Sequence, residues 1–184
     1  MPAGMLLALA LTFYEGDIKY DCRRVEQGIS FANLPAPSGY HLQTGGPFDS
    51  HLSQVSAEGP LEALHGWQVS GVACVAHLTA GNCSRLEQAR ETGRQLAKMR
   101  VHGSALSFPP RRTPPVMDAG NGVFSFPSAD GVREQHHYNF GLLPEEDPRH
   151  QRVTQFSTAL AACTESMGRA HGRAYRYFNT PAGS

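Results

Sequence analysis

The tripeptide His77-Leu78-Thr79 comes nearest to catalytic chemistry in this chain of 184 residues. In an extended strand, residues i and i+2 lie on the same face, so an imidazole and a hydroxyl with this spacing can converge on one phosphate group. Two other tripeptides, His51-Leu52-Ser53 and His102-Gly103-Ser104, have the same pattern, only slightly more matches than chance predicts. One functional hypothesis is therefore a small hydrolase or phosphodiesterase in which His77 and Thr79 act with a second histidine, His102.

A further group of candidate residues lies at His136 and His137, which are adjacent in the sequence. Neighbouring residues of a strand point to opposite faces, so these two rings cannot bind one metal ion together. Glu134 and His136 share a face and could form a base with its orienting carboxylate, although such a pair at a sheet edge is more often structural. The sequence has no nucleotide-binding glycine loop and no closely spaced pair of metal-ligating cysteines. We expect no metal and no cofactor.

The four cysteines, Cys22, Cys74, Cys83 and Cys163, allow three disulfide pairings if the protein is exported. A strand that continues from Cys74 to Thr79 rises about 17 Å, and the four residues back to Cys83 return at most about 14 Å. A Cys74–Cys83 bridge therefore requires an early strand end or a nearly straight return. The pairing stays open. Cys83, beside a helix start, is the best candidate for a reactive thiol, while Cys163 lies on an apolar helix stripe that suits a free cysteine.

Composition and charge argue against several classes of partner. The formal net charge is +0, so no overall field attracts nucleic acid, and we expect no nucleic-acid partner. The apolar run from Met5 to Phe13 is too short to span a bilayer, and no transmembrane segment is expected. This run fits a strand within residues 1–14, with the remnant of an export signal as the alternative. Together with the four cysteines, it favours an exported protein, periplasmic or secreted, over a cytoplasmic one.

Hydrophobic patterning predicts both strands and helices. Residues 66–81 favour a strand that is apolar on both faces after Gly71 and therefore central in its sheet. Ser84 and Glu87 form an S-x-x-E capping box at the start of a helix expected over 84–100. Asn121-Gly122 indicates a turn, and Asp130-Gly131 indicates a hairpin between two later strands. Shorter strands are expected at 40–43, 101–108, 123–126 and 131–143.

The last helix has the clearest boundaries. Asp147 is expected as its N-cap and Pro148 as its first residue. An apolar stripe at helical spacing continues to Met167, and Gly168 supplies a stop, so the helix is expected over 148–167. The basic and aromatic tail that follows is expected to add a last strand or to hang free.

These elements predict an α+β fold, a mostly antiparallel sheet with two main helices packed on one face. Residues 1–184 are expected to form a single domain, with a possible internal break at the proline-rich segment 109–115. Because loops are abundant and no catalytic set stands out, we favour a non-catalytic recognition or inhibitor-type domain, comparable to an immunity protein. Its loops within 30–60 and 108–122 are expected to bind a protein partner. A small hydrolase and a structural subunit of an assembly are the alternatives.

Overall fold

The computed structural model describes residues 10–25, 39–46, 48–99, 121–130, 132–139 and 147–181. Several predictions lie outside these residues, namely His102, the strand at 101–108, the proline-rich segment 109–115, almost all of the partner-binding loop 108–122, residues 30–38 of the other loop region, and residues 140–143 of the strand at 131–143. The same holds for residues 1–9 of the expected first strand. The fold and its candidate sites are built from the described residues alone.

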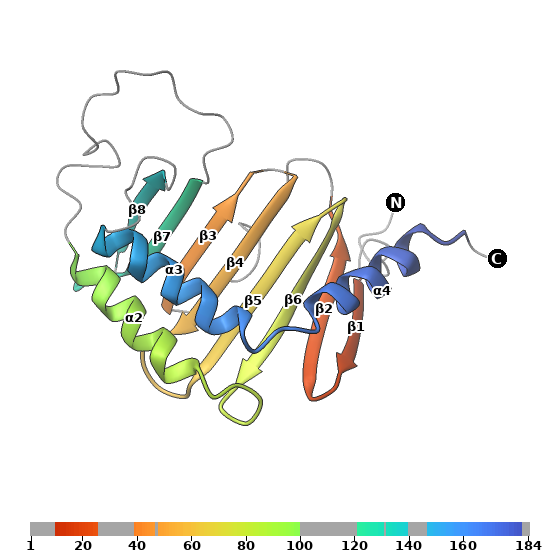
Figure 1. Cartoon of the computed structure of the whole chain (residues 1–184), viewed down its shortest axis with the longest axis horizontal. Coiled ribbons are helices and arrows are strands. Elements are labelled where there is room, and N and C mark those ends of the chain that lie inside the picture. Colours follow the sequence, from red (N-terminus) through yellow and green to blue (C-terminus); the bar gives the residue numbers. More distant parts are fainter. Residues whose placement is uncertain are drawn as a thin grey trace, which may run out of the picture.

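Eight antiparallel strands form one sheet. They are β1 (Ala10–Glu15), β2 (Ile18–Arg24), β3 (Gly39–Gly45), β4 (Asp49–Ser56), β5 (Glu62–Val69), β6 (Val72–Thr79), β7 (Asn121–Pro127) and β8 (Arg133–Asn139). Their order across the sheet is β1-β2-β6-β5-β4-β3-β7-β8 (Figure 1). β6 pairs with β2 and β5, so it is an inner strand, as its apolar sequence predicts.

One strand prediction and one turn prediction are wrong. Ser70 and Gly71 have φ angles of 54° and 75°, and they close a tight hairpin in which Val69 pairs with Val72. A type I′ turn needs positive φ at both central residues, so the region 66–81 is split into the ends of two strands. Asn121-Gly122 was expected to form a turn, but it begins β7, where Gly122 pairs with a residue of β3.

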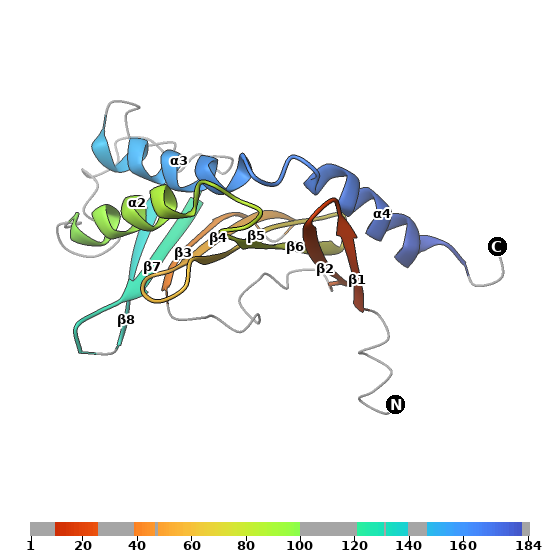
Figure 2. The same ribbon diagram turned by 90° about the horizontal axis from the view of Figure 1, so that it is seen from below.

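Among the described residues, three helices cover one face of the sheet, which confirms the predicted α+β fold (Figure 2). α2 (Leu86–Lys98) and α3 (Pro148–Ala161) pack side by side over β3, β4 and β5. α4 (Met167–Asn179) packs on β6 and β2, and it extends past the sheet edge at β1 (Figure 1). We call this side of the sheet the helical face and the other side the opposite face.

The start of α2 differs from the predicted capping box. The N-cap is Arg85, and no side chain caps the helix, so Ser84 does not pair with Glu87 as predicted. A tight turn after β6 replaces this motif. The Thr79 N–H donates to Asn82 Oδ1 at 2.8 Å, and the Cys83 N–H donates to the Thr79 carbonyl at 2.9 Å. The turn and a disulfide at Cys83 therefore position the helix start without help from a serine hydroxyl.

The second predicted helix is two helices. Its start is confirmed, because the Asp147 carboxylate accepts the Arg149 N–H at 2.9 Å and Pro148 is the first residue. Its predicted end at 167 is wrong, since α3 ends at Ala161 and α4 begins at Met167. Gly168 therefore lies in the first turn of a helix instead of stopping one. The tail that was expected as a strand or a free end is helical because it has its own apolar stripe, Met167, Ala170, His171, Ala174 and Phe178.

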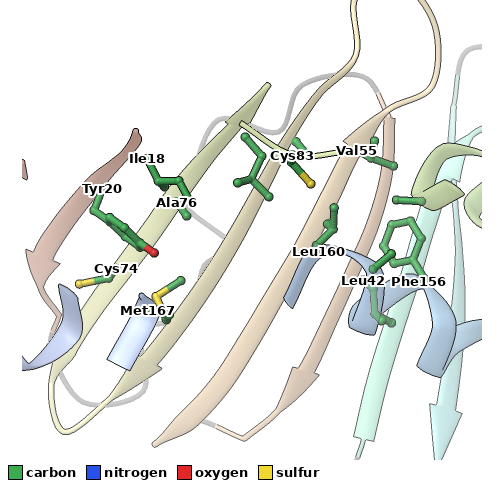
Figure 3. Packing of buried hydrophobic residues seen from close by; sticks show 14 of the residues in the cluster. Ile18, Tyr20, Leu42, Val55, Cys74, Ala76, Cys83, Phe156, Leu160 and Met167 are labelled. Carbon is green, nitrogen blue, oxygen red and sulfur yellow. The ribbon is translucent and has the colours of Figure 1, made fainter. Parts of the chain in front are cut away.

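The main hydrophobic core lies between the helices and the sheet. Phe156 and Leu160 of α3 and Met167 of α4 point into it among the side chains of the strands (Figure 3). Complete burial of a large apolar side chain contributes about 1.5–3 kcal/mol, so this layer supplies most of the driving force for folding. A smaller cluster of Leu52, Ala73 and Val75 is buried on the opposite face.

Two disulfides tie the structure together, and neither is the local bridge considered from the sequence. Cys22 of β2 and Cys74 of β6 are directly opposed, with α-carbons 4.1 Å apart. Cys83 pairs with Cys163, just after α3. β6 continues to Thr79, which is the condition under which a Cys74–Cys83 bridge does not form. The reactive thiol expected at Cys83 and the free cysteine expected at Cys163 are therefore wrong.

Candidate functional site

The predicted histidine His77 has a carboxylate partner on the neighbouring strand. Cys22 and Cys74 point into the core, so Asp21 and His77 lie on the opposite face. His77 Nε2 is 2.6 Å from Asp21 Oδ2, and the two side chains are 40% and 44% exposed. Sequence analysis missed Asp21 because the contact depends on the pairing of β2 with β6.

A hydroxyl completes this group. Thr12 of β1 donates its Oγ1 proton to the other oxygen of the Asp21 carboxylate at 2.5 Å. Burial raises the pKa of Asp21, but the hydrogen bonds from Thr12 and His77 outweigh burial, so this pKa lies below its ordinary value. We call Thr12, Asp21 and His77 the Asp21–His77 couple. It is a histidine ring oriented by a carboxylate that stays ionised.

Of the other predicted catalytic residues that the structure describes, only Thr79 lies on the same face of the sheet as the Asp21–His77 couple. Thr79 lies on the same strand face as His77, and it is exposed. His51 and Ser53 of the second tripeptide share the face of the core residue Val55, so they are on the helical face. His102 is outside the described residues. The predicted pair of His77 with His102 therefore stays a prediction.

A second histidine lies under the helices and is held uncharged. Ser53 Oγ and His65 Nδ1 form a hydrogen bond of 3.2 Å between β4 and β5. Burial lowers the pKa of His65 to about 4, and the nearby His51 adds a small repulsion in the same direction. The hydroxyl is as inaccessible as the ring, since Ser53 is 2% exposed. This pair is therefore neutral and shielded near pH 7.

Beyond Ser53 and His65, four side chains form what we call the Trp67 cluster: Asp49, His51, Trp67 and His171. Trp67 Nε1 donates to Asp49 Oδ1 at 2.9 Å. The indole contacts two imidazoles, with centroid distances of 6.0 Å to His51 and 4.9 Å to His171. Asp49 and His51 are exposed although they point to the helical face, so the helices leave this end of β4 uncovered.

α4 is anchored beside the Trp67 cluster by polar contacts with the sheet. His171 Nε2 donates to the carbonyls of Val69 and Val72 at 3.0 and 3.1 Å. The Tyr20 hydroxyl of β2 bonds to Ser166 Oγ, before the first turn of α4. Of this cluster only His51 was a candidate in the sequence, because His51 and Trp67 meet only through the β4–β5 register and His171 reaches them from a distant helix.

The predicted Glu134–His136 pair is present on β8. Glu134 Oε1 lies 3.2 Å from His136 Nε2. The imidazole also packs edge-on against Phe126, with centroids 5.0 Å apart. These contacts fit the structural role considered from the sequence, because the ring is buried against the core and tied to one carboxylate.

No protein-family model, curated protein or solved structure matches this chain. Within the described part of the chain, no group of three or more His, Cys, Asp or Glu side chains could hold a metal ion. No helix in the same residues is long and apolar enough to cross a membrane.

Proposed function

We propose that the protein is a non-catalytic recognition domain of the inhibitor type, which binds a protein partner at the end of the sheet where β4 begins. The observation that carries this proposal is Phe48, a large apolar side chain in the β3–β4 connection that is 62% exposed. It adjoins Asp49 of the Trp67 cluster, whose rings are already ordered by stacking and a hydrogen bond. Preorganised aromatic side chains commonly dominate the binding energy of protein interfaces.

Two further features support this surface. Phe48 lies within the region 30–60, where loops were expected to contact a partner. Beside the cluster on the same face, the Ser53–His65 pair is fixed in place, because both side chains are buried and hydrogen-bonded to each other. A rigid neighbour of this kind lowers the conformational entropy that is lost when a partner orders the surface.

The test is capture of the partner with disulfide-intact protein as bait in an extract of its source cells. We expect one stoichiometric partner over a range of salt concentrations, and its loss with the double variant Phe48→Ser/His51→Ala. Val132→Ser is the matched control, since it removes an apolar side chain that is similarly exposed in the β7–β8 turn. A blank capture at every salt concentration, or equal capture by the wild type and the double variant, contradicts the proposal.

The disulfides support export as part of the same proposal, because such bonds persist in oxidising compartments and are rare in the cytosol. In the structure all four cysteines are paired. A thiol reagent applied to the purified, unreduced protein should therefore detect no free thiol until the protein is both unfolded and reduced. Four free thiols in freshly isolated protein would contradict export.

The Asp21–His77 couple supports a second candidate function, a small hydrolase with His77 as general base. A carboxylate 2.6 Å from Nε2 orients the ring, which a general base needs in order to take a proton from water. Thr79, on the same face, is available to contact a phosphate oxygen. His77→Gln should abolish hydrolysis of a panel of phosphodiesters with an unchanged melting curve, while His51→Gln on the other face keeps the activity. A wild-type protein with no hydrolysis above the blank rules this candidate out.

A further inference from the structure

α4 carries a stripe of arginines on the side opposite its buried residues. Arg169, Arg173 and Arg176 are spaced i, i+4 and i+7, which places them on one side of a helix with 3.6 residues per turn. All three are exposed, whereas the apolar stripe of α4 is buried against β6 and β2. The 13 residues of this helix include no acidic side chain. The outer side of α4 is therefore positively charged along its length.

Two tyrosines flank this stripe. Tyr175 and Tyr177 are 43% and 55% exposed, and at about 100° per residue they project on either side of the arginines. We call Arg169, Arg173, Arg176, Tyr175 and Tyr177 the α4 outer surface. Its C-terminal part lies where α4 extends past the sheet edge (Figure 1), so a ligand can reach it from several directions.

The charges of this surface are only partly compensated by side chains in the described part of the chain. Arg173 Nη1 is 3.8 Å from Glu15 Oε1, and its guanidinium lies 4.4 Å from the centroid of the Phe13 ring. These contacts hold Arg173 in place. Across the described residues, neither Arg169 nor Arg176 forms an ion pair. Arg169 and Arg176, which have no ion-pair partner among the described residues, therefore lie on either side of the oriented Arg173.

We propose that the α4 outer surface binds an extended acidic segment of the protein partner, an inference that rests on the proposed recognition function. Guanidinium groups pair with carboxylates through two parallel hydrogen bonds, which are stronger than neutral ones. Arg169 and Arg176 are about 10 Å apart along the helix axis at 1.5 Å per residue. Alternate residues of an extended chain are about 7 Å apart on one side. Two or three acidic residues at alternate positions span about 7 or about 14 Å, and the long arginine side chains can adjust to either spacing.

The chemistry of α4 favours a protein over a membrane or a nucleic acid. Its apolar stripe is already buried in the core, so the helix has no apolar side with which to enter a lipid interface. Its exposed side chains include three arginines and two tyrosines but no lysine, and arginine and tyrosine are enriched at protein interfaces whereas lysine is depleted. The formal net charge of +0 provides no long-range attraction to a polyanion.

Binding to a defined probe tests this inference directly. The probe is a fluorescein-labelled peptide of alternating Asp and Ser, with an Asn–Ser peptide of equal length as the uncharged control. We expect saturable, salt-sensitive binding of the Asp–Ser peptide by the full, disulfide-intact protein in fluorescence anisotropy. Arg169→Gln/Arg176→Gln should weaken it by about tenfold or more, because two charge-assisted contacts are lost. Tyr175→Ala/Tyr177→Ala should weaken it severalfold.

A control of equal charge separates a local surface from a general charge effect. Arg85→Gln/Lys98→Gln removes two exposed positive charges from the ends of α2 and should leave the affinity within about twofold, as expected for distant charges screened by salt. Equal loss in both double variants overturns the inference. So does tighter binding of single-stranded DNA, or of vesicles that contain phosphatidylglycerol, than of the Asp–Ser peptide.

The two proposals fail in different ways. If a partner is captured through Phe48 and His51 but the α4 double variant captures it equally well, the acidic-segment inference is wrong and the recognition function stands. If no partner is captured at any salt concentration, the recognition function is wrong, whatever the peptide titration shows.

Discussion

His77 and His65 lie on neighbouring strands of one sheet, yet their surroundings differ completely. His77 is on the opposite face, open to solvent and bound to the ionised Asp21. His65 points to the helical face, where burial keeps it neutral and a serine hydroxyl is its partner. Side chains alternate between the two faces along each strand, so the position of a histidine in its strand determines which of the two environments it occupies. The comparison shows that the solvent access and the hydrogen-bond partners of a histidine in a strand depend on what covers the face to which its ring points.

Each histidine also has a disulfide nearby. Cys22–Cys74 joins the same two strands as the Asp21–His77 couple, and Cys22 is next to Asp21 in the sequence. Cys83–Cys163 joins the turn after β6 to the end of α3, the helix that packs on β5. One bridge therefore fixes a strand pair, and the other holds the helical layer in place over His65.

The largest expected effect is on the bridge that holds the helical layer. Cys83→Ala/Cys163→Ala opens a cross-link with a sequence separation of 80, and loop entropy predicts a loss of about 4 kcal/mol in the free energy of unfolding. Because α3 then packs less tightly on β5, the pKa of His65 should rise towards its ordinary value. Denaturant unfolding and a proton NMR titration of the imidazole measure the two effects.

Cys22→Ala/Cys74→Ala is the matched control, with a separation of 52 and a similar expected loss of about 4 kcal/mol. This variant should leave the pKa of His65 unchanged. An equal rise of that pKa in both variants would show that the helical layer is not what shields the ring.

The next effect is the dependence of stability on pH. Because the pKa of His65 is about 4 in the folded protein against an ordinary value of 6.5, the unfolded chain binds a proton between these pH values that the folded protein does not accept. The stability that His65 supports is therefore complete above pH 6.5 and is lost as the pH falls. From pH 7.5 to pH 4.5 the loss is about 2.5 kcal/mol. Unfolding at several pH values in wild type and His65→Gln should show a flatter profile in the variant, and parallel profiles would disprove this origin.

The smallest effect is expected at the exposed couple. His77→Gln should change the free energy of unfolding by less than about 1 kcal/mol at pH 7, since water competes for partly exposed ion pairs. Thr12→Val should raise the pKa of Asp21, because it removes a hydrogen bond to the carboxylate. Carboxyl carbon NMR measures that pKa. A loss above 2 kcal/mol in His77→Gln would place the couple among the structural elements and weaken the contrast with His65.

Local chemistry accounts for the parts of the fold that the sequence predicts. Asp147 and Pro148 mark the start of α3 because a cap acts within one turn, and the apolar run of β6 marks an inner strand. The capping box predicted at Ser84 and Glu87 does not form, because it too depends on contacts within one turn. A motif of four residues competes with the turn at Asn82 and with a disulfide to a residue far along the chain, and the stronger constraints decide where α2 begins.

The candidate sites were less predictable than the fold. His77 and Thr79 share a strand, so their common face follows from spacing, but Asp21 reaches His77 only through the β2–β6 pairing. Trp67, His51 and His171 come from two strands and a helix that was predicted to be a tail. Register and helix docking depend on the total packing of the molecule, which no short stretch of sequence specifies.

The strand order also determines in which order the parts of the sheet can form during folding. The β1–β2 hairpin, the β3–β6 meander and the β7–β8 hairpin each pair strands that are adjacent in sequence, whereas β2–β6 and β3–β7 join them across long stretches of chain. Such non-local pairings form slowly, since loop closure costs entropy before the contacts are made. Cys22 and Cys74 face each other across one of these late joints. During oxidative refolding, the formation of this bond therefore records the docking of the first hairpin on the completed meander.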